Sequence, residues 1–295
     1  MDRVRRIINA QRAYERGYYG EGIGVAVLDT GIYLHPDFGQ RVSCFLDYIN
    51  GRKAPYDDNG HGTHIGGIIG GDGGVSQGTY MGIAPRCHFI IIKILDRKGN
   101  GNTEHVVQAV DWLVRHRQAY RIRIVNISIG MVLKAESRER IRLLQAVDYA
   151  WDSGMVVVAA AGNNGPRGSS ITVPGVSRKV ITVGCFDDNR EQIGRSMLKP
   201  DYSGQGPTEH CIVKPELVVP GTNVTSCSIY PGMYMRKSGT SMAAPIVSGS
   251  IALLLSKYPQ FSPAEVKLRL YQCAQDLGLP SAKQGWGMLD IGQLL

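Results

Sequence analysis

Val25-Ala26-Val27-Leu28-Asp29-Thr30-Gly31 is an apolar run that ends in a carboxylate and a turn. Such a run is typical of a buried strand that carries an acid to its carboxyl end. Similar runs predict further strands, which gives the set 24–29, 88–95, 122–128, 155–160 and 180–184. Apolar residues at helical spacing predict helices over 103–120, 136–153, 242–258 and 262–273.

The alternation of strands and helices predicts an α/β fold with a mainly parallel central sheet and helices on both faces. Continuous apolar strands are expected where both faces of a parallel sheet are covered. Ligands bind to such sheets outside the carboxyl ends of the strands. Asp29, Ser128 and Asn163 each follow a predicted strand at that end, so we expect them to share one site.

Composition narrows the class of protein. The chain has 295 residues, of which 43% are hydrophobic, enough for a large core in one α/β unit. No apolar run approaches the length that spans a bilayer. The formal net charge is +8, with basic residues concentrated at 3–6, 115–123 and 138–142. These charges alternate with apolar residues at helical spacing, which favours solvated helix faces over a nucleic-acid-binding stripe.

The amino terminus and the cysteines bear on location. Residues 1–6 are charged and no signal-peptide core follows them, so we expect a cytoplasmic protein, with a secreted mature fragment as the alternative. Six cysteines at 44, 87, 185, 211, 227 and 273 form no CxxC pair. A chain of this length does not depend on disulfides, so we expect buried, reduced thiols.

The stretch Gly239-Thr240-Ser241-Met242-Ala243-Ala244-Pro245 places a serine at the start of an apolar helix. We expect Pro245 in the first helical turn, where a missing N–H costs little. Ser241 would then be a nucleophile near the positive end of a helix dipole. A serine needs a base, and the base needs an orienting acid, before it can act as a nucleophile.

The sequence supplies these partners. His61 and His64 lie in a glycine-rich segment, and Asn163 follows the apolar strand that ends at 160. The two histidines are three residues apart with no glutamate between them, so the zinc-protease helix pattern is absent and no metal ligands are assigned. Asp29, His61, Asn163 and Ser241 follow one another at spacings of 32, 102 and 78 residues.

This order of acid, histidine, amide and serine resembles that of the subtilisin-family serine proteases, or subtilases. The resemblance extends from about residue 19 to 295, and the segments 96–101 and 125–130 share it. Segments 76–85 and 179–184 are most similar to the bacterial intracellular, alkaline-protease-like branch. The resemblance implies one catalytic domain over 1–295 with a three-layer fold, in which residues 1–18 are an amino-terminal extension and no full propeptide is present.

The resemblance also implies the chemistry of a serine endopeptidase. Ser241 would attack the peptide carbonyl, His61 would carry the proton and Asp29 would orient His61. Asn163 would stabilise the oxyanion, and His64 would be a packed helix residue. Substrate contacts fall on Gly99, Asn100, Gly101, Ser128, Ile129, Gly130 and Asn164.

We expect broad specificity with an apolar or aromatic preference in the primary pocket, because the sequence shows no obvious carboxylate that would line this pocket. Asp57 and Asp58 precede His61 and suggest an acidic neighbouring subsite, with a solvated loop as the alternative. The resemblance implies that the partners are peptide or protein substrates, and it allows a proteinaceous inhibitor. We expect neither nucleic acid nor membrane as a partner.

No cofactor is required by this chemistry. The segment 70–82, where secreted relatives carry a tight calcium loop, has one carboxylate, Asp72. Calcium takes six to eight oxygen ligands, so we expect no calcium there, while a weaker site elsewhere stays open. Two other classes remain as alternatives: a catalytically silent binding module with this fold, and a structural or nucleic-acid-associated protein suggested by the basic charge.

Overall fold

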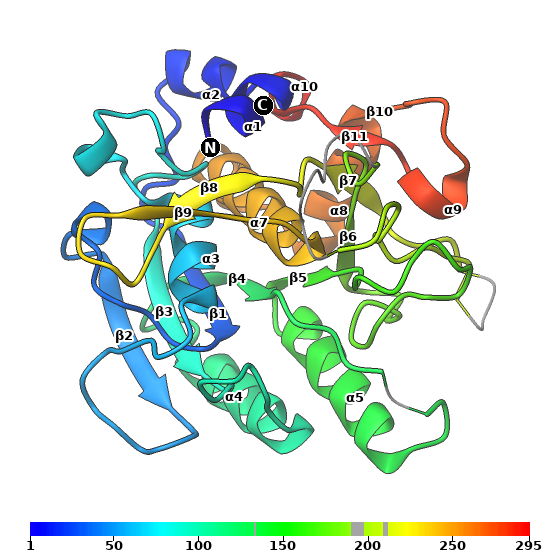
Figure 1. Cartoon of the computed structure of the whole chain (residues 1–295), viewed down its shortest axis with the longest axis horizontal. Helices are drawn as coiled ribbons and strands as arrows, with labels where there is room; N and C mark the ends of the chain where they lie inside the picture. The colour runs from blue at the N-terminus through cyan, green and yellow to red at the C-terminus, as the bar shows by residue number, and fades with distance from the viewer. Residues whose placement is uncertain (133, 190–197, 209–211) are drawn as a thin grey trace.

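A nine-stranded sheet forms the centre of the protein in a computed structural model that describes residues 1–132, 134–189, 198–208 and 212–295 (Figure 1). The strands lie in the order β10-β11-β7-β6-β5-β4-β1-β3-β2, and all neighbours are parallel except β10 and β11. Their bounds are β1 Gly24–Asp29, β2 Val42–Asp47, β3 His88–Lys93, β4 Ile122–Ile127, β5 Val156–Ala160, β6 Ile181–Cys185, β7 Leu217–Val219, β10 Ala274–Gln275 and β11 Met288–Leu289.

The direction in which strands are added reverses at β1. Its neighbours are β3 on one side and β4 on the other, and the chain then continues outward through β5, β6 and β7. A parallel sheet opens a crevice at the carboxyl ends of the strands where this reversal occurs. Asp29, the last residue of β1, therefore stands at the point where a parallel sheet binds its ligands.

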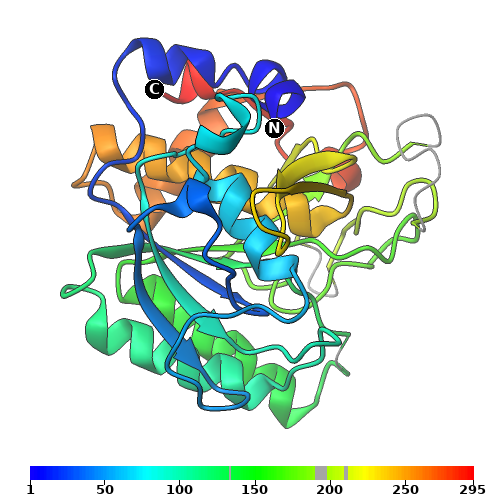
Figure 2. The same cartoon turned by 60° about the vertical axis from the view of Figure 1, so that its left-hand side comes forward.

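Helices cover both faces of the sheet and make three layers (Figure 2). Helices α3 (His61–Gly70) and α7 (Thr240–Lys257) pack together on one face, and α4 (Thr103–His116) and α5 (Arg138–Asp152) on the other. Side chains of β1 alternate between the two layers, so Val25 and Val27 belong to the first core and Ala26 and Leu28 to the second. This three-layer α/β arrangement is the one predicted from the sequence.

Smaller elements close the α7 side. Val4 and Ile8 of the amino-terminal segment are buried in the core, so residues 1–18 are part of the packed body. The elements are α1 Asp2–Ile7, α2 Gln11–Glu15, η1 Pro36–Phe38, η2 Gly74–Ser76, α8 Pro263–Cys273, α9 Ser281–Gln284 and α10 Ile291–Leu294, with the antiparallel pair β8 Val224–Cys227 and β9 Tyr234–Lys237. Both chain ends lie on this side of the sheet (Figure 1).

Helix α7 passes through the interior. Among the helices of the described ranges it is the one long and apolar enough to cross a membrane, yet 83% of it is buried inside the protein. Its apolar composition is therefore that of a core helix. It begins at Thr240 and not at 242, so Pro245 lies in the second turn, contrary to expectation. The missing N–H of Pro245 leaves the carbonyl of Ser241 without its intrahelical partner.

The cysteines of the described residues are unpaired, as predicted. Cys87, Cys185, Cys227 and Cys273 are buried and Cys44 is partly buried, and all five are free thiols. The sixth cysteine, at position 211, lies outside the described residues. The fold is therefore held by packing and hydrogen bonds wherever it is described.

Candidate active site

A carboxylate and an imidazole meet at the carboxyl end of β1. Asp29 is fully buried, and His61, the first residue of α3, places Nδ1 2.8 Å from Asp29 Oδ1 and 2.9 Å from Oδ2. The N–H of Thr30 also donates to Asp29 Oδ1 at 2.8 Å. A carboxylate beside Nδ1 fixes the tautomer that carries its proton there, which leaves Nε2 free to accept a proton.

The close approach of α3 to β1 depends on a glycine. A Cβ at Gly62 would overlap the carbonyl oxygen of Gly31, so the helix could not reach this position with a larger residue. The N–H of Gly62 instead donates to the hydroxyl of Thr30 at 2.9 Å. The glycines around His61 therefore let its ring reach the buried acid.

Asp57 holds the start of α3 in place. Its carboxylate accepts hydrogen bonds from the N–H groups of Asn59, Gly60 and Thr63 and from the hydroxyls of Thr30 and Thr63. Burial alone would raise the pKa of Asp57, but the hydrogen bonds from Thr63, Gly60 and Asn59 outweigh it and lower the pKa. A carboxylate at a helix amino terminus satisfies unpaired N–H groups and favours the dipole.

The two aspartates before His61 do not form a free acidic subsite. Asp57 is 9% exposed and its oxygens are occupied, as described above. Asp58 is paired with Lys93, whose Nζ lies 2.7 Å from Asp58 Oδ1 and also donates to the carbonyls of Thr30 and Leu95. The sequence-based hypothesis of an acidic subsite therefore fails, because a buried lysine neutralises the one exposed carboxylate.

Ser241 and His61 line the same surface cleft. It is the second residue of α7 and is partly exposed. Gly239, before the helix, has φ +140°, a conformation that favours glycine. The residues that line this cleft with Ser241 come from four loops and from the first residue of α3: Thr30, Asn59, His61, Leu95, Gly99, Ser128, Ile129 and Gly130.

Asn163 lies beside the start of α7. Its Oδ1 accepts hydrogen bonds from both the N–H and the hydroxyl of Thr240, each at 3.0 Å, and that hydroxyl also accepts the N–H of Gly162 at 3.1 Å. The side-chain oxygen is therefore occupied, and the amide N–H₂ is left as the group that can donate elsewhere. Thr240 orients the amide, a role that the sequence reasoning missed.

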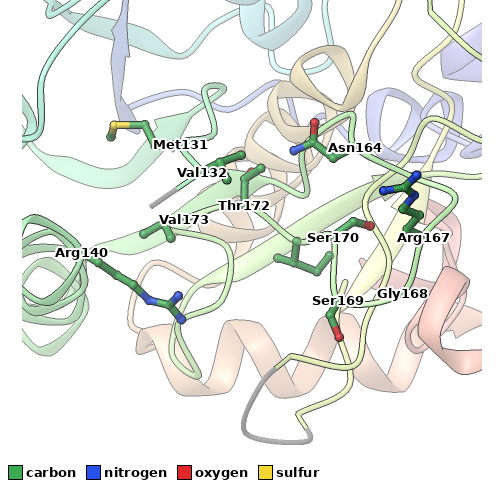
Figure 3. Close-up of a pocket in the computed structure, with 11 residues that line it drawn as sticks. Met131, Val132, Arg140, Asn164, Arg167, Gly168, Ser169, Ser170, Thr172 and Val173 are labelled. Atoms are coloured by element: carbon green, nitrogen blue, oxygen red, sulfur yellow. The ribbon is translucent and has the colours of Figure 1, made fainter. Parts of the chain in front are cut away.

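The predicted substrate contacts divide into three groups. Gly99, Ser128, Ile129 and Gly130 line the cleft of Ser241, as expected. Asn100 and Gly101 lie in the same loop as Gly99 without lining the cleft, and Asn164 lines a neighbouring pocket. Gly130 lines the cleft and the next residue, Met131, lines that pocket, which Figure 3 shows.

His64, the second histidine of the motif, has no access to the cleft. It is fully buried, and its Nε2 donates to the carbonyls of Val224 and Met235, each at 3.1 Å. Burial, together with the charge of nearby Lys237, lowers the pKa of His64 from 6.5 to about 3. The neutral ring therefore ties α3 to the β8–β9 pair, which agrees with its prediction as a packed helix residue.

Comparisons with known proteins define the class. The subtilase family, Peptidase S8, matches residues 20–287. Serine protease AprX of Bacillus subtilis is 39% identical over 84% of this chain, and Subtilisin DY of Bacillus licheniformis is 33% identical over 97% of this chain and 95% of its own length. The solved structures of S41 psychrophilic protease and sphericase match with TM-scores of 0.79 and 0.77, each at 30% identity over 92% of both chains.

This chain belongs to the subtilase family of serine proteases. Its fold is the subtilisin-like fold of the solved relatives. It spans 60% of the length of AprX. AprX and Subtilisin DY are bacterial proteases, which agrees with the family and the class of enzyme predicted from the motifs.

The burial of His64 predicts an acid-sensitive contribution to stability. Between pH 6.5 and about 3 the unfolded chain protonates this ring and the folded chain does not, so stability falls as the pH is lowered through that range. The full shift corresponds to something on the order of 5 kcal/mol. We expect His64→Gln, which keeps an N–H donor but does not titrate, to lose less stability between pH 6.5 and 4.5 than the parent.

The measurement is urea unfolding at a series of pH values, with all variants in a Ser241→Ala background to prevent self-digestion. His116→Gln is the matched control, because that ring lies partly exposed on α4 against Trp112. Equal slopes for His64→Gln and its parent would show that His64 does not carry the effect.

Proposed function

We propose that this protein is an endopeptidase in which Ser241, His61 and Asp29 act as a catalytic triad. The observation that carries the proposal is the pair of short contacts between Asp29 and Nδ1 of His61, in a cleft that Ser241 also lines. An acid that orients an imidazole beside an exposed serine is the arrangement that activates a serine nucleophile.

The reaction would proceed through an acyl-enzyme. Ser241 Oγ attacks the peptide carbonyl while Nε2 of His61 takes the hydroxyl proton, and Asp29 stabilises the imidazolium that results. The amide N–H₂ of Asn163 and the backbone N–H of Ser241 donate to the oxyanion. His61 then gives the proton to the leaving amine, and a water molecule, deprotonated by His61, releases the carboxylic acid from Ser241.

The substrate would lie extended between two backbone segments. Gly99 and the run Ser128-Ile129-Gly130 line the cleft from two different loops. Backbone pairing with a peptide strand gives affinity without a strict demand on sequence. The two loop segments that carry Gly99 and Gly130 can pair with a substrate through their backbone, which supports broad specificity.

The neighbouring pocket supports an apolar or aromatic preference for the residue before the scissile bond. Its walls include Met131, Val132, Ile171 and Val173, and no carboxylate is among the described residues that line it (Figure 3). Burial of an apolar side chain contributes about 1.5–3 kcal/mol, which is enough to select it. The guanidinium of Arg167 at this pocket makes glutamate the competitor to test.

A peptide series tests both the nucleophile and the preference. Chromogenic peptides that differ only in the residue before the scissile bond, with Phe, Leu, Ala, Lys or Glu, should be cleaved fastest for Phe and Leu. Ser241→Ala should abolish the cleavage of every member, and a fluorophosphonate should label the parent and not the variant. No cleavage and no labelling of the folded parent would indicate a silent scaffold, and a preference for Glu or Lys would overturn the pocket assignment.

The two neighbouring asparagines provide a matched pair for the oxyanion role. We expect Asn163→Ala to lower kcat by about 10²–10³-fold, the effect known for the equivalent kind of donor in subtilisin. Asn164→Ala should change kcat by less than about tenfold, because Asn164 lines the neighbouring pocket. Steady-state kinetics on one Phe peptide measure both, and equal losses in the two variants would contradict the assignment of Asn163.

We propose that catalysis needs no cofactor, since every step above uses protein groups and water. In the segment 70–82, Asp72 Oδ1 accepts the N–H of Gly74, and Asp72 Oδ2 lies 3.9 Å from Arg41. A carboxylate engaged in this way offers little to a calcium ion. Returning calcium to chelator-treated enzyme should leave its rate unchanged at 25 °C.

A further inference from the structure

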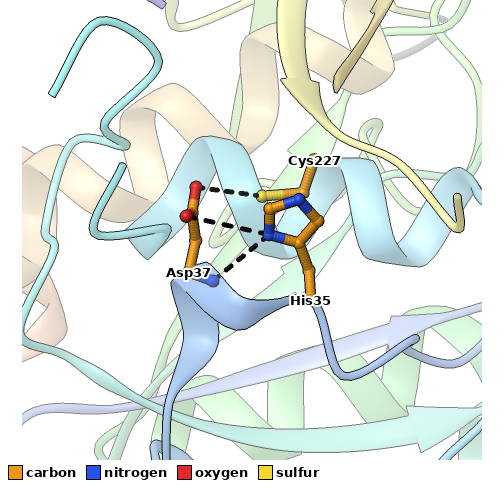
Figure 4. A group of neighbouring side chains, drawn as sticks. All are labelled: His35, Asp37 and Cys227. Atoms are coloured by element: carbon orange, nitrogen blue, oxygen red, sulfur yellow. Dashed lines mark hydrogen bonds and ion pairs between the residues drawn. The ribbon is translucent and has the colours of Figure 1, made fainter. Parts of the chain in front are cut away.

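Three buried side chains with different ligand chemistry meet beside α3, away from the cleft of Ser241. His35 and Asp37 flank the start of η1, and Cys227 is the last residue of β8 (Figure 4). Their exposed fractions are 1%, 0% and 1%. An imidazole, a carboxylate and a thiol are the three side chains from which zinc sites are built.

The distances suit one metal ion. His35 Nδ1 lies 3.8 Å from Asp37 Oδ1, and Cys227 Sγ lies 3.8 Å from Asp37 Oδ2. One ligand atom from each residue lies within 4.8 Å of the others. Tetrahedral zinc, with bonds of about 2.0–2.3 Å, places its ligand atoms about 3.3–3.5 Å apart. The two 3.8 Å pairs need to contract by a few tenths of an ångström, and the most distant pair, at up to 4.8 Å, by up to about 1.5 Å.

The tautomer of His35 is also suitable. Nδ1 accepts the N–H of Asp37 at 3.2 Å, so the proton is on Nε2, and a metal ion would replace that N–H as the partner of the Nδ1 lone pair. Nε2 of His35 has no hydrogen-bond partner of normal geometry in the described part of the chain. The backbone carbonyl of Met233 nevertheless interacts with the His35 ring. A metal-bound histidine usually donates its second N–H to such a carbonyl.

Neighbouring groups hold the carboxylate in position. The hydroxyl of Tyr234 donates to Asp37 Oδ2 at 2.7 Å, and the N–H of Val75 donates to Oδ1 at 3.1 Å. These bonds leave lone pairs on both oxygens, because an ionised carboxylate can accept about four hydrogen bonds or ligand contacts. Asp37 can therefore keep both partners and still bind a cation.

We propose that His35, Asp37 and Cys227 bind one thiophilic divalent cation, zinc, with water as the fourth ligand. Calcium does not fit this set, because it takes oxygen ligands alone. On binding, the thiol of Cys227 loses its proton to solvent, and a zinc–thiolate bond replaces the S–H contact with Asp37. Because zinc binds the thiolate and not the thiol, affinity should fall as the pH is lowered.

The site would be structural. A Cβ built at Gly67 or Gly71 would meet Cys227 Sγ, so the thiol packs directly against α3 and its end. A metal ion here would join η1 to β8, beside the helix that begins with His61. Zinc should therefore raise thermal stability without taking part in the reaction.

Cobalt provides a spectroscopic probe of the ligands. Purified full-length protein in the Ser241→Ala background is titrated with Co²⁺, and a sulfur-to-cobalt charge-transfer band should saturate at one equivalent per chain. Cys227→Ala and His35→Gln should each abolish or strongly weaken the band. Cys273→Ala is the matched control, because it removes another buried thiol, 5% exposed on α8, and should keep the band.

Zinc itself provides the second measurement. One equivalent of Zn²⁺ should raise the thermal midpoint of the parent and of Cys273→Ala by several degrees, and not that of Cys227→Ala. X-ray absorption at the zinc edge of the parent should show one sulfur neighbour, a result that does not depend on any variant folding. The absence of a band in the parent, a band that survives Cys227→Ala, or a zinc shell without sulfur would each overturn the proposal.

Discussion

The contact between the buried carboxylate of Asp29 and Nδ1 of His61 is the constraint that organises this protein. It requires β1 to end at the reversal point of the sheet and α3 to start within hydrogen-bonding distance of that end. Gly62 permits the approach, and the hydroxyl of Thr30 receives the N–H of the same glycine. Helices α3 and α7, which carry His61 and Ser241, are rich in small residues. They therefore pack closely together on one face of the sheet.

Buried charge around this contact is balanced by local partners. Asp57 accepts five hydrogen bonds at the start of α3, and Lys93 pairs with Asp58 while it donates to two carbonyls. Removing one partner of a buried pair leaves an uncompensated charge and costs several kcal/mol, about 3–5. The neutral ring of His64, one turn along α3 from His61, adds a third set of hydrogen bonds that holds this helix in place. These groups keep the imidazole in place without taking part in the reaction.

Much of the architecture could be predicted from the sequence, because long apolar runs and helical spacing are local signals. The strand at 24–29 and the helix start at Ser262, with its capping box, match the prediction. Strand β2, with its half-buried residues, and the short strands β7, β8 and β9 were not predicted, since few residues carry each signal. The roles of Thr240 and Lys93 depend on contacts across 77 and 35 residues, which no local pattern contains.

The substitution Asp29→Asn tests the central claim most directly, because it keeps the shape of the acid and removes its charge. If Asp29 fixes the tautomer of His61, kcat for a Phe peptide should fall by about 10⁴-fold while KM changes little. Asp72→Asn, which alters a carboxylate in the 70–82 segment, should leave kcat near that of the parent. A value of kcat for Asp29→Asn within tenfold of the parent, in protein that is shown to be folded, would contradict the account.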